Sequence, residues 1–159
     1  MKFSDFVVAA AIQADVKADD KSGVITELVQ ALAAAGAVKP GEADGIIAAI
    51  MKREELGSTG IGRGVAVPHT KHASVDRLIG AVGVSHSGVD FDSLDGDKVH
   101  LFFLLVSPPD RAPDHLRALE NISRQLRDET FCRFLKQASA TSEIQQLLNE
   151  SDSHQYGSA

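Results

Sequence analysis

The sequence lacks the features that mark several classes of protein. It contains a single cysteine, Cys132, so no internal disulfide can form, and we expect a protein of the reducing cytoplasm. Its apolar runs, such as residues 7–12 (VVAAAI), are far shorter than a membrane-spanning helix or a secretory leader, so no membrane insertion is expected. The net charge of −6 argues against nucleic acid as the main partner, because phosphate binding needs clustered Lys and Arg.

The apolar pattern that is present predicts an α/β protein. Helical spacing predicts helices over residues 21–35 and 42–56, from Pro113 onward, and over 130–137 and 142–149. Strands are predicted over residues 78–85 and 99–106, and the second is expected to be covered on both faces. We therefore expect a mixed β-sheet sandwiched between helices on both faces. A single domain is expected over residues 1–150, followed by a disordered tail over residues 151–159.

Local signals add detail to the first and third helices. Asp19 or Asp20 can cap the start of the first helix, and Gly36 is well placed to end it. In the third helix, four apolar residues at helical spacing are expected to face the core: Leu116, Leu119, Ile122 and Leu126.

The segment over residues 57–72, GSTGIGRGVAVPHTKH, concentrates glycine and histidine. Its glycines allow turns and the close approach of another backbone or of a partner; they are Gly57, Gly60, Gly62 and Gly64. Residues 65–67 are strand-like, and Pro68 is expected to end the strand because proline has no N–H to donate. The segment therefore predicts that His69 is held at an open edge of the sheet.

Two histidines and one arginine have positions that suit a phosphoryl group. His69 follows a predicted strand, and His115 lies in the first turn of the third helix, where free N–H groups favour anions. An imidazole is a competent nucleophile near neutral pH because much of it is uncharged there. Arg53, near the end of the second helix, can supply a forked donor to phosphate oxygens.

Simpler interpretations of these residues stay open. Each histidine also fits a solvated position in a turn or first helical turn, and Arg53 within KREE fits a solvated helix end with local ion pairs. His69 and His72 have a spacing that can bind a metal, but no Cys or acidic residue lies at ligand spacing, so no metal site is expected. The GIGRG run lacks the lysine of a phosphate-cradling loop, which argues against a bound nucleotide.

Two longer motifs carry a family resemblance. KREELGSTGIGRGVAVPH, followed by SPPDRAPDHLRALENISRQL, resembles the enzyme IIA component of the bacterial phosphoenolpyruvate:sugar phosphotransferase system, of the fructose/mannitol type. The likeness runs over residues 5–150 and includes the Arg-Glu pair, the TGIGxGxAxPH core and a second His followed by Leu. Within that family, REELGSTGIGRG and FCRFL look most like the nitrogen-regulatory branch. Thr70 departs from the pattern, since many members carry Gly there.

The resemblance implies a phosphocarrier that needs no cofactor or metal. By that likeness His69 is the phosphorylated nucleophile and accepts its phosphoryl group from a phosphohistidine carrier of the HPr type. His115 matches the family position that assists at the same site, and Arg53 the position that stabilises the phosphate. The downstream partner stays open between a regulatory target protein and the IIB subunit of a fructose/mannitol-type permease. The sequence shows no transporter or cysteine-bearing phosphoacceptor segment, which favours the regulatory role.

Overall fold

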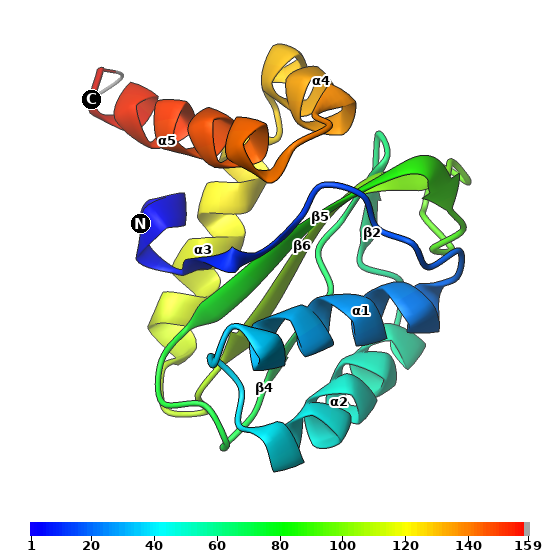
Figure 1. Ribbon diagram of the computed structural model, residues 1–159, viewed down its shortest axis with the longest axis vertical. Helices are drawn as coiled ribbons and strands as arrows, with labels where there is room; N and C mark the ends of the chain where they lie inside the picture. The colour runs from blue at the N-terminus through cyan, green and yellow to red at the C-terminus, as the bar shows by residue number, and fades with distance from the viewer. Residues whose placement is uncertain (158–159) are drawn as a thin grey trace.

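A mixed six-stranded sheet forms the middle layer of the molecule (Figure 1). The computed structural model describes the backbone of residues 1–157 and the side chains of residues 1–153. The strands are β1 (Val7–Gln13), β2 (Gly60–Gly62), β3 (Val65–Ala66), β4 (His69–Lys71), β5 (Ile79–Val89) and β6 (Val99–Ser107). They follow the order β1-β5-β6-β3-β2, and β4 also pairs with β6. β5 is antiparallel to β6, whereas β3 and β4 are parallel to it.

Helices cover both faces of this sheet, as predicted (Figure 1). One face carries α1 (Lys21–Ala34) and α2 (Ala43–Glu55), and the other carries α3 (Ala112–Gln125), α4 (Glu129–Gln137) and α5 (Thr141–Gly157). Two short 3-10 helices, η1 (Phe3–Asp5) and η2 (Pro40–Glu42), complete the described elements. The predicted fold class, a mixed sheet between two layers of helices, is confirmed.

The central strand β6 explains why residues 101–106 form an unbroken apolar run. Side chains alternate along a strand, so Phe102 and Leu104 pack into the core beneath α1 and α2, while Phe103 and Leu105 pack into the core beneath α3. Both faces of the strand are buried from water, and apolar residues are therefore favoured on both. The strand ends at Ser107, which is fully buried and polar.

The start of α1 follows the expected capping chemistry. The carboxylate of Asp20 accepts a hydrogen bond of 2.7 Å from the backbone N–H of Gly23. At the other end, Gly36 has φ of 80°, a left-handed conformation that glycine adopts without strain. Both predicted boundaries are confirmed to within a residue.

Pro68 lies between two short strands that both pair with β6. β3 and β4 lie before and after it, and both pair parallel with β6. Pro68 has no N–H to donate, but its carbonyl oxygen accepts a hydrogen bond of 3.0 Å from the N–H of Leu105. The prediction that Pro68 ends the strand over residues 65–67 is confirmed, because β3 ends at Ala66. What the sequence did not predict is β4, which begins at His69 and pairs with the same strand, β6.

Two other expectations differ from the structure. The buried face of α3 includes His115, Ala118 and Ile122, whereas Leu116 is 57% exposed. The predicted inner stripe is confirmed at Ile122 and Leu126, and Leu119 packs partly buried against the same core. The prediction is wrong at Leu116, since His115 occupies the buried face in the first turn. Residues 7–13, noted only as an apolar run, form β1, which pairs parallel with β5.

The C-terminal helix α5 extends further than expected. It runs to Gly157, and Asp152 is only 6% exposed. The Asp152 carboxylate accepts hydrogen bonds of 2.7 Å and 3.0 Å from the backbone N–H groups of Phe3 and Ser4. Asp152 lies in the stretch for which the sequence predicted a disordered tail, and it instead holds the N-terminal residues in place. Residues 158–159 lie outside the described part of the chain.

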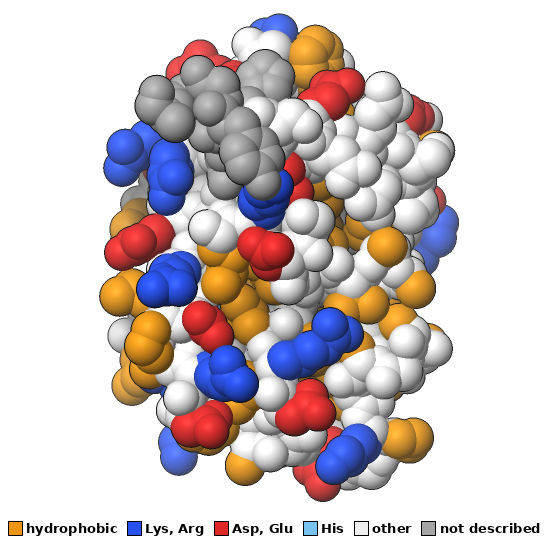
Figure 2. All heavy atoms as spheres, turned by 90° about the vertical axis from the view of Figure 1, so that its left-hand side faces the viewer, with side chains coloured by type: hydrophobic (Ala, Val, Ile, Leu, Met, Phe, Trp, Pro, Cys, Tyr) orange, Lys and Arg blue, Asp and Glu red, His pale blue; other side chains and the backbone are white. Residues whose placement is uncertain are grey.

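The face that carries α3 and the N-terminal segment has mixed charge (Figure 2). Lys and Arg side chains are interspersed there with Asp and Glu side chains, so no patch of one sign covers this face. Within the part of the chain that the structure describes, no helix is long and apolar enough to cross a membrane.

Candidate phosphoryl-transfer site

His69 begins β4, and the residues just before it hold its imidazole. Its Nδ1 atom lies 2.7 Å from the carbonyl oxygen of Val67. A carbonyl oxygen can only accept, so Nδ1 carries the proton and the neutral ring keeps its lone pair on Nε2. Burial, only partly opposed by the hydrogen bond to Val67, lowers the pKa of His69 below its usual value of 6.5. The ring is therefore uncharged at neutral pH.

His115 lies in the first turn of α3, just beyond the end of β6. Its side chain is 6% exposed, and its Nδ1 atom lies 2.5 Å from the hydroxyl oxygen of Ser107. Burial lowers the pKa of His115 to about 4, and the electrostatic influence of the neighbouring His69 and Lys71 acts in the same direction. This second imidazole is also neutral at neutral pH.

The structure brings the three predicted residues together. The rings of His69 and His115 have centroids 5.3 Å apart and are tilted by 59°. Both rings line one open hollow together with Arg53, Thr70, Lys71 and Leu119. Sequence reasoning missed Lys71, although a residue two places along a strand lies on the same face as His69. It also missed Ser107, whose signal is a polar residue at the end of a buried apolar strand.

Arg53 reaches the hollow from the last turn of α2. One guanidinium nitrogen, NH1, donates a 3.1 Å hydrogen bond to the carbonyl oxygen of Gly57. A guanidinium has five N–H donors in a fixed fork, so donors remain for an anion in the hollow. Arg53 and Lys71 give the hollow positive charge beside two neutral imidazoles.

The neighbouring Glu54 turns inward and fixes the end of α2. Glu54 is 6% exposed, and its carboxylate oxygens lie 3.2 Å and 3.1 Å from the backbone N–H of Thr59, which donates to them. The ammonium of Lys21 lies 3.2 Å from the same carboxylate. The Arg-Glu pair of the sequence therefore combines one residue at the hollow with one that anchors the helix end beneath it.

Most glycines of the 57–72 segment face the chain's own residues. A Cβ at Gly60 would lie 3.1 Å from the Cα of Ser93 and would clash with its hydroxyl. A Cβ at Gly62 would lie 3.2 Å from the Asp95 carboxylate, which also accepts a hydrogen bond from the N–H of Arg63. The expectation that these glycines let a partner reach the backbone is thus wrong at Gly60 and Gly62, because a loop of the same chain occupies that space.

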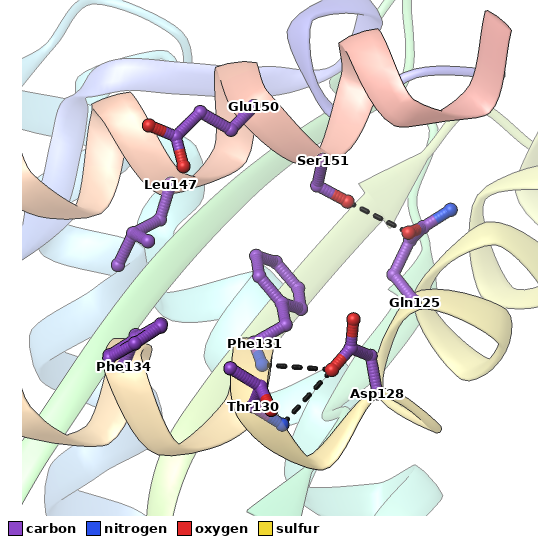
Figure 3. A pocket seen from close by; sticks show the side chains of 8 residues that line it. All are labelled: Gln125, Asp128, Thr130, Phe131, Phe134, Leu147, Glu150 and Ser151. Atoms are coloured by element: carbon purple, nitrogen blue, oxygen red, sulfur yellow. Dashed lines mark hydrogen bonds between the residues drawn. The ribbon is translucent and has the colours of Figure 1, made fainter. Parts of the chain in front are cut away.

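A second hollow lies apart from the histidines, between α4, α5 and the end of α3 (Figure 3). Phe131, Phe134 and Leu147 line it with apolar surface. Its polar groups serve the fold: the Ser151 hydroxyl donates to the Gln125 side chain, and the Asp128 carboxylate caps α4. The candidate residues all belong to the first hollow.

The chemistry of the first hollow suits an anionic group. A neutral imidazole with a free lone pair is a nucleophile, and the nearby cations can stabilise negative charge. Among residues 1–153, no three His, Cys, Asp or Glu side chains cluster in a way that could hold a metal ion.

Comparison with known proteins identifies the family. Residues 6–151 match the family described as "Phosphoenolpyruvate-dependent sugar phosphotransferase system, EIIA 2". The chain belongs to this EIIA 2 family. It is a phosphocarrier component of the phosphotransferase system.

Individual relatives of this EIIA protein divide between two roles. It is 34% identical over 149 residues to a nitrogen regulatory protein of Bradyrhizobium diazoefficiens, covering 93% of this chain and 95% of that protein. It is 36% identical over 152 residues to the fructose-specific EIIABC component of Bacillus subtilis, covering 96% of this chain but only 24% of that protein. The crystal structure of nitrogen regulatory protein IIA-Ntr from Neisseria meningitidis superposes with a TM-score of 0.82 at 27% identity, over 92% of this chain and 98% of that one.

Proposed function

We propose that this EIIA protein accepts a phosphoryl group on Nε2 of His69 from a phosphohistidine carrier of the HPr type. The hydrogen bond between His69 Nδ1 and the Val67 carbonyl is the observation that carries the proposal. It assigns the ring proton to Nδ1 and leaves the Nε2 lone pair available in an open hollow. The lowered pKa of His69 supports the same role, because a protonated ring has no lone pair to offer.

The transfer step needs no proton movement at His69. The Nε2 lone pair forms the new N–P bond while the N–P bond of the donor histidine breaks, and the donor imidazole leaves with that electron pair. Nδ1 keeps its proton, and its hydrogen bond to Val67 then stabilises the positive charge that the phosphorylated ring acquires. Arg53 stabilises the phosphoryl oxygens as a charge-assisted donor, and His115 assists from the facing side of the hollow.

We further propose that the phosphorylated protein is regulatory, of the nitrogen type. The similarity to the Bradyrhizobium nitrogen regulatory protein over nearly its full length supports this role, as does the likeness to the Neisseria structure. A phosphoryl group adds about −1.5 to −2 charges at neutral pH, which gives a target protein a large difference to recognise. The alternative is a sugar-transport component that passes the phosphoryl group to a IIB subunit, and the similarity to the fructose-specific EIIABC component supports it.

Intact-mass measurement after incubation with phosphoenolpyruvate, enzyme I and an HPr-type carrier tests the proposal. We expect one added phosphoryl group that is labile in acid and stable in base, as phosphohistidine is. His69→Ala should keep the fold and gain no mass, whereas His100→Ala, at a histidine outside the hollow, should be phosphorylated like the parent. Equal labelling of His69→Ala and the parent protein would show that another residue is the acceptor.

A second measurement separates the two downstream roles. The phosphorylated protein is mixed with a purified IIB domain of the fructose/mannitol type, and the label on each protein is followed with time. Rapid transfer supports the transport role. Retention of the label, together with a target protein that binds only one of the two phosphorylation states, supports the regulatory role.

A further inference from the structure

We propose that Ser107 is a positioning residue for the transfer: its hydroxyl fixes the tautomer of His115 so that this ring presents its Nε2–H to the phosphoryl group on His69. The inference rests on the proposed role of His69 and deepens it by assigning the group that prepares the assisting histidine.

Ser107 joins the two elements that carry the histidines. It is the last residue of β6 and is fully buried. Its carbonyl oxygen accepts a 2.9 Å hydrogen bond from the N–H of His72, and it lies opposite Lys71 in the β4–β6 pairing. Its hydroxyl oxygen lies 2.5 Å from Nδ1 of His115 on α3. Ser107 is therefore hydrogen-bonded both to the segment that carries His69 and to the helix that carries His115.

The burial of Ser107 decides the direction of its hydrogen bond. If His115 Nδ1–H donated to Ser107, the serine O–H would need a second acceptor, and residues 1–153 place none within hydrogen-bond reach. A buried O–H without an acceptor is unfavourable, because it has given up its hydrogen bond to water and gained none in return. If Ser107 donates to Nδ1 instead, its O–H is satisfied, and the proton of the neutral imidazole must lie on Nε2.

The tautomer matters because His115 is neutral. A neutral imidazole has one N–H, and with a pKa of about 4 His115 carries no second proton at pH 7. With the proton on Nε2, the free edge of the ring is a donor to phosphoryl oxygens. With the proton on Nδ1, the free edge is a lone pair, which repels those oxygens. The ring of His69 lies 5.3 Å away between centroids, so the choice of tautomer acts directly on the reacting group.

A merely structural serine would leave the tautomer of His115 and the transfer rate unchanged when it is removed. Ser85 provides a matched control, because it is also fully buried in the sheet but lies on β5, where its hydroxyl accepts from the N–H of Gly88. Its side chain is not among those that line the hollow with the histidines.

Two measurements test the proposal. Two-bond ¹H–¹⁵N spectra of the unphosphorylated protein identify which nitrogen of His115 carries the proton, and rapid-quench kinetics give the rate of phosphorylation by the carrier. In the parent protein and Ser85→Ala, we expect the proton on Nε2. In Ser107→Ala, we expect a mixture of tautomers and a rate reduced about tenfold to a hundredfold, as when a partner that orients a metal-binding histidine is removed. Ser107→Thr, which keeps a hydroxyl, should restore most of the Nε2–H signal.

The outcomes separate this proposal from that for His69. A proton on Nδ1 of His115 in the parent protein overturns the inference, as does an unchanged spectrum and rate in Ser107→Ala. If Ser107→Ala does not fold, the spectrum of the parent protein still decides the direction of the hydrogen bond, and the spectrum and rate of Ser107→Thr decide whether the retained hydroxyl serves transfer. If His69 takes no phosphoryl group at all, the proposed function fails. The tautomer of His115 is still measured in that case, because its spectrum is recorded on the unphosphorylated protein.

Discussion

At one end of the segment over residues 57–72, glycines pack against a loop of the same chain; at the other end, a histidine lines an open hollow. Gly60 and Gly62 leave no room for a side chain because Ser93 and Asp95 lie against them. His69, in contrast, is only partly buried, and its Nε2 atom is free of the hydrogen bond that holds Nδ1. One end is built for intramolecular packing and the other for contact with a reaction partner.

The contrast distinguishes two sequence signals that occur together in this segment, a run of glycines and a titratable residue. A dense run of glycine indicates close packing, but it does not say whether the neighbour belongs to the same chain or to another. A titratable residue beside cations in an open hollow points to chemistry more directly, because such a group gains nothing for packing. Changes at the two ends should therefore affect different properties, phosphoryl transfer at one and stability at the other.

The largest effect is expected for His115→Ala. Loss of one preorganised donor at a site of developing negative charge slows reactions by about 100-fold to 1000-fold, and we expect a decrease of a few hundred-fold in the rate of phosphoryl transfer. Phosphorylation should still reach completion with excess carrier, because His115 does not form the bond. Rapid-quench kinetics give the rate, and His100→Ala serves as the control. A parental rate in His115→Ala would remove this residue from the site.

The layered fold was open to prediction from sequence because it depends on long, repeated patterns. The unbroken apolar run of residues 101–106 predicts a strand with two dry faces, and helical spacing predicts α1 and α2. Short elements were missed for a physical reason: β2 and β4 have three residues each, and pairing with neighbours, rather than local propensity, makes them strands. Asp152 was missed because its partners, Phe3 and Ser4, lie at the opposite end of the chain.

The candidate site was predictable only in part. The motifs singled out His69, His115 and Arg53, and the structure brings these three to one hollow. The hydrogen bonds that assign the tautomers join His69 to Val67 and His115 to Ser107, and nothing in residue spacing reveals them. The error at Leu116 has the same origin, because His115 is buried in the first turn of α3 against a partner at the end of β6.

Acid should weaken the fold through His115, which lines the same hollow as the histidine end of the segment. The pKa of His115 is about 4 in the folded protein and near 6.5 when unfolded. Between these values the unfolded chain binds a proton that the folded protein does not, so stability is complete above pH 6.5 and falls as the pH drops toward 4. The loss reaches up to about 3 kcal/mol.

Chemical denaturation at a series of pH values measures this dependence. In His115→Gln, which cannot titrate, the slope between pH 6.5 and pH 4 should become shallower. The remaining slope includes His69, whose pKa is also lowered. Identical slopes in the two proteins would mean that His115 is protonated in the folded state as readily as in the unfolded one.

Gly60→Ala should affect the other end of the segment and reduce stability by about 1–3 kcal/mol, the usual cost of overpacking. The new Cβ would meet the backbone and side chain of Ser93, so the loop over residues 92–97 must shift. Urea denaturation gives the change, and Gly41→Ala is the matched control because open space surrounds its Cβ position. Phosphorylation of His69 should keep its parental rate; a large loss of rate with unchanged stability would reverse the division of roles between the two ends.

The smallest effect is expected for Arg53→Lys, at the point where the two ends meet. Arg53 contacts the glycine end through the carbonyl of Gly57 and lines the hollow that holds His69. Lysine keeps the charge but cannot supply a planar fork that holds Gly57 and a phosphoryl oxygen together. Loss of one charge-assisted hydrogen bond costs about 1.5 kcal/mol, which corresponds to a rate about tenfold slower. Lys52→Gln, at the exposed neighbouring position, removes a charge outside the hollow and should leave the rapid-quench rate unchanged. If Lys52→Gln slows transfer as much as Arg53→Lys, then general positive charge at the end of α2, rather than the fork of Arg53, assists the reaction.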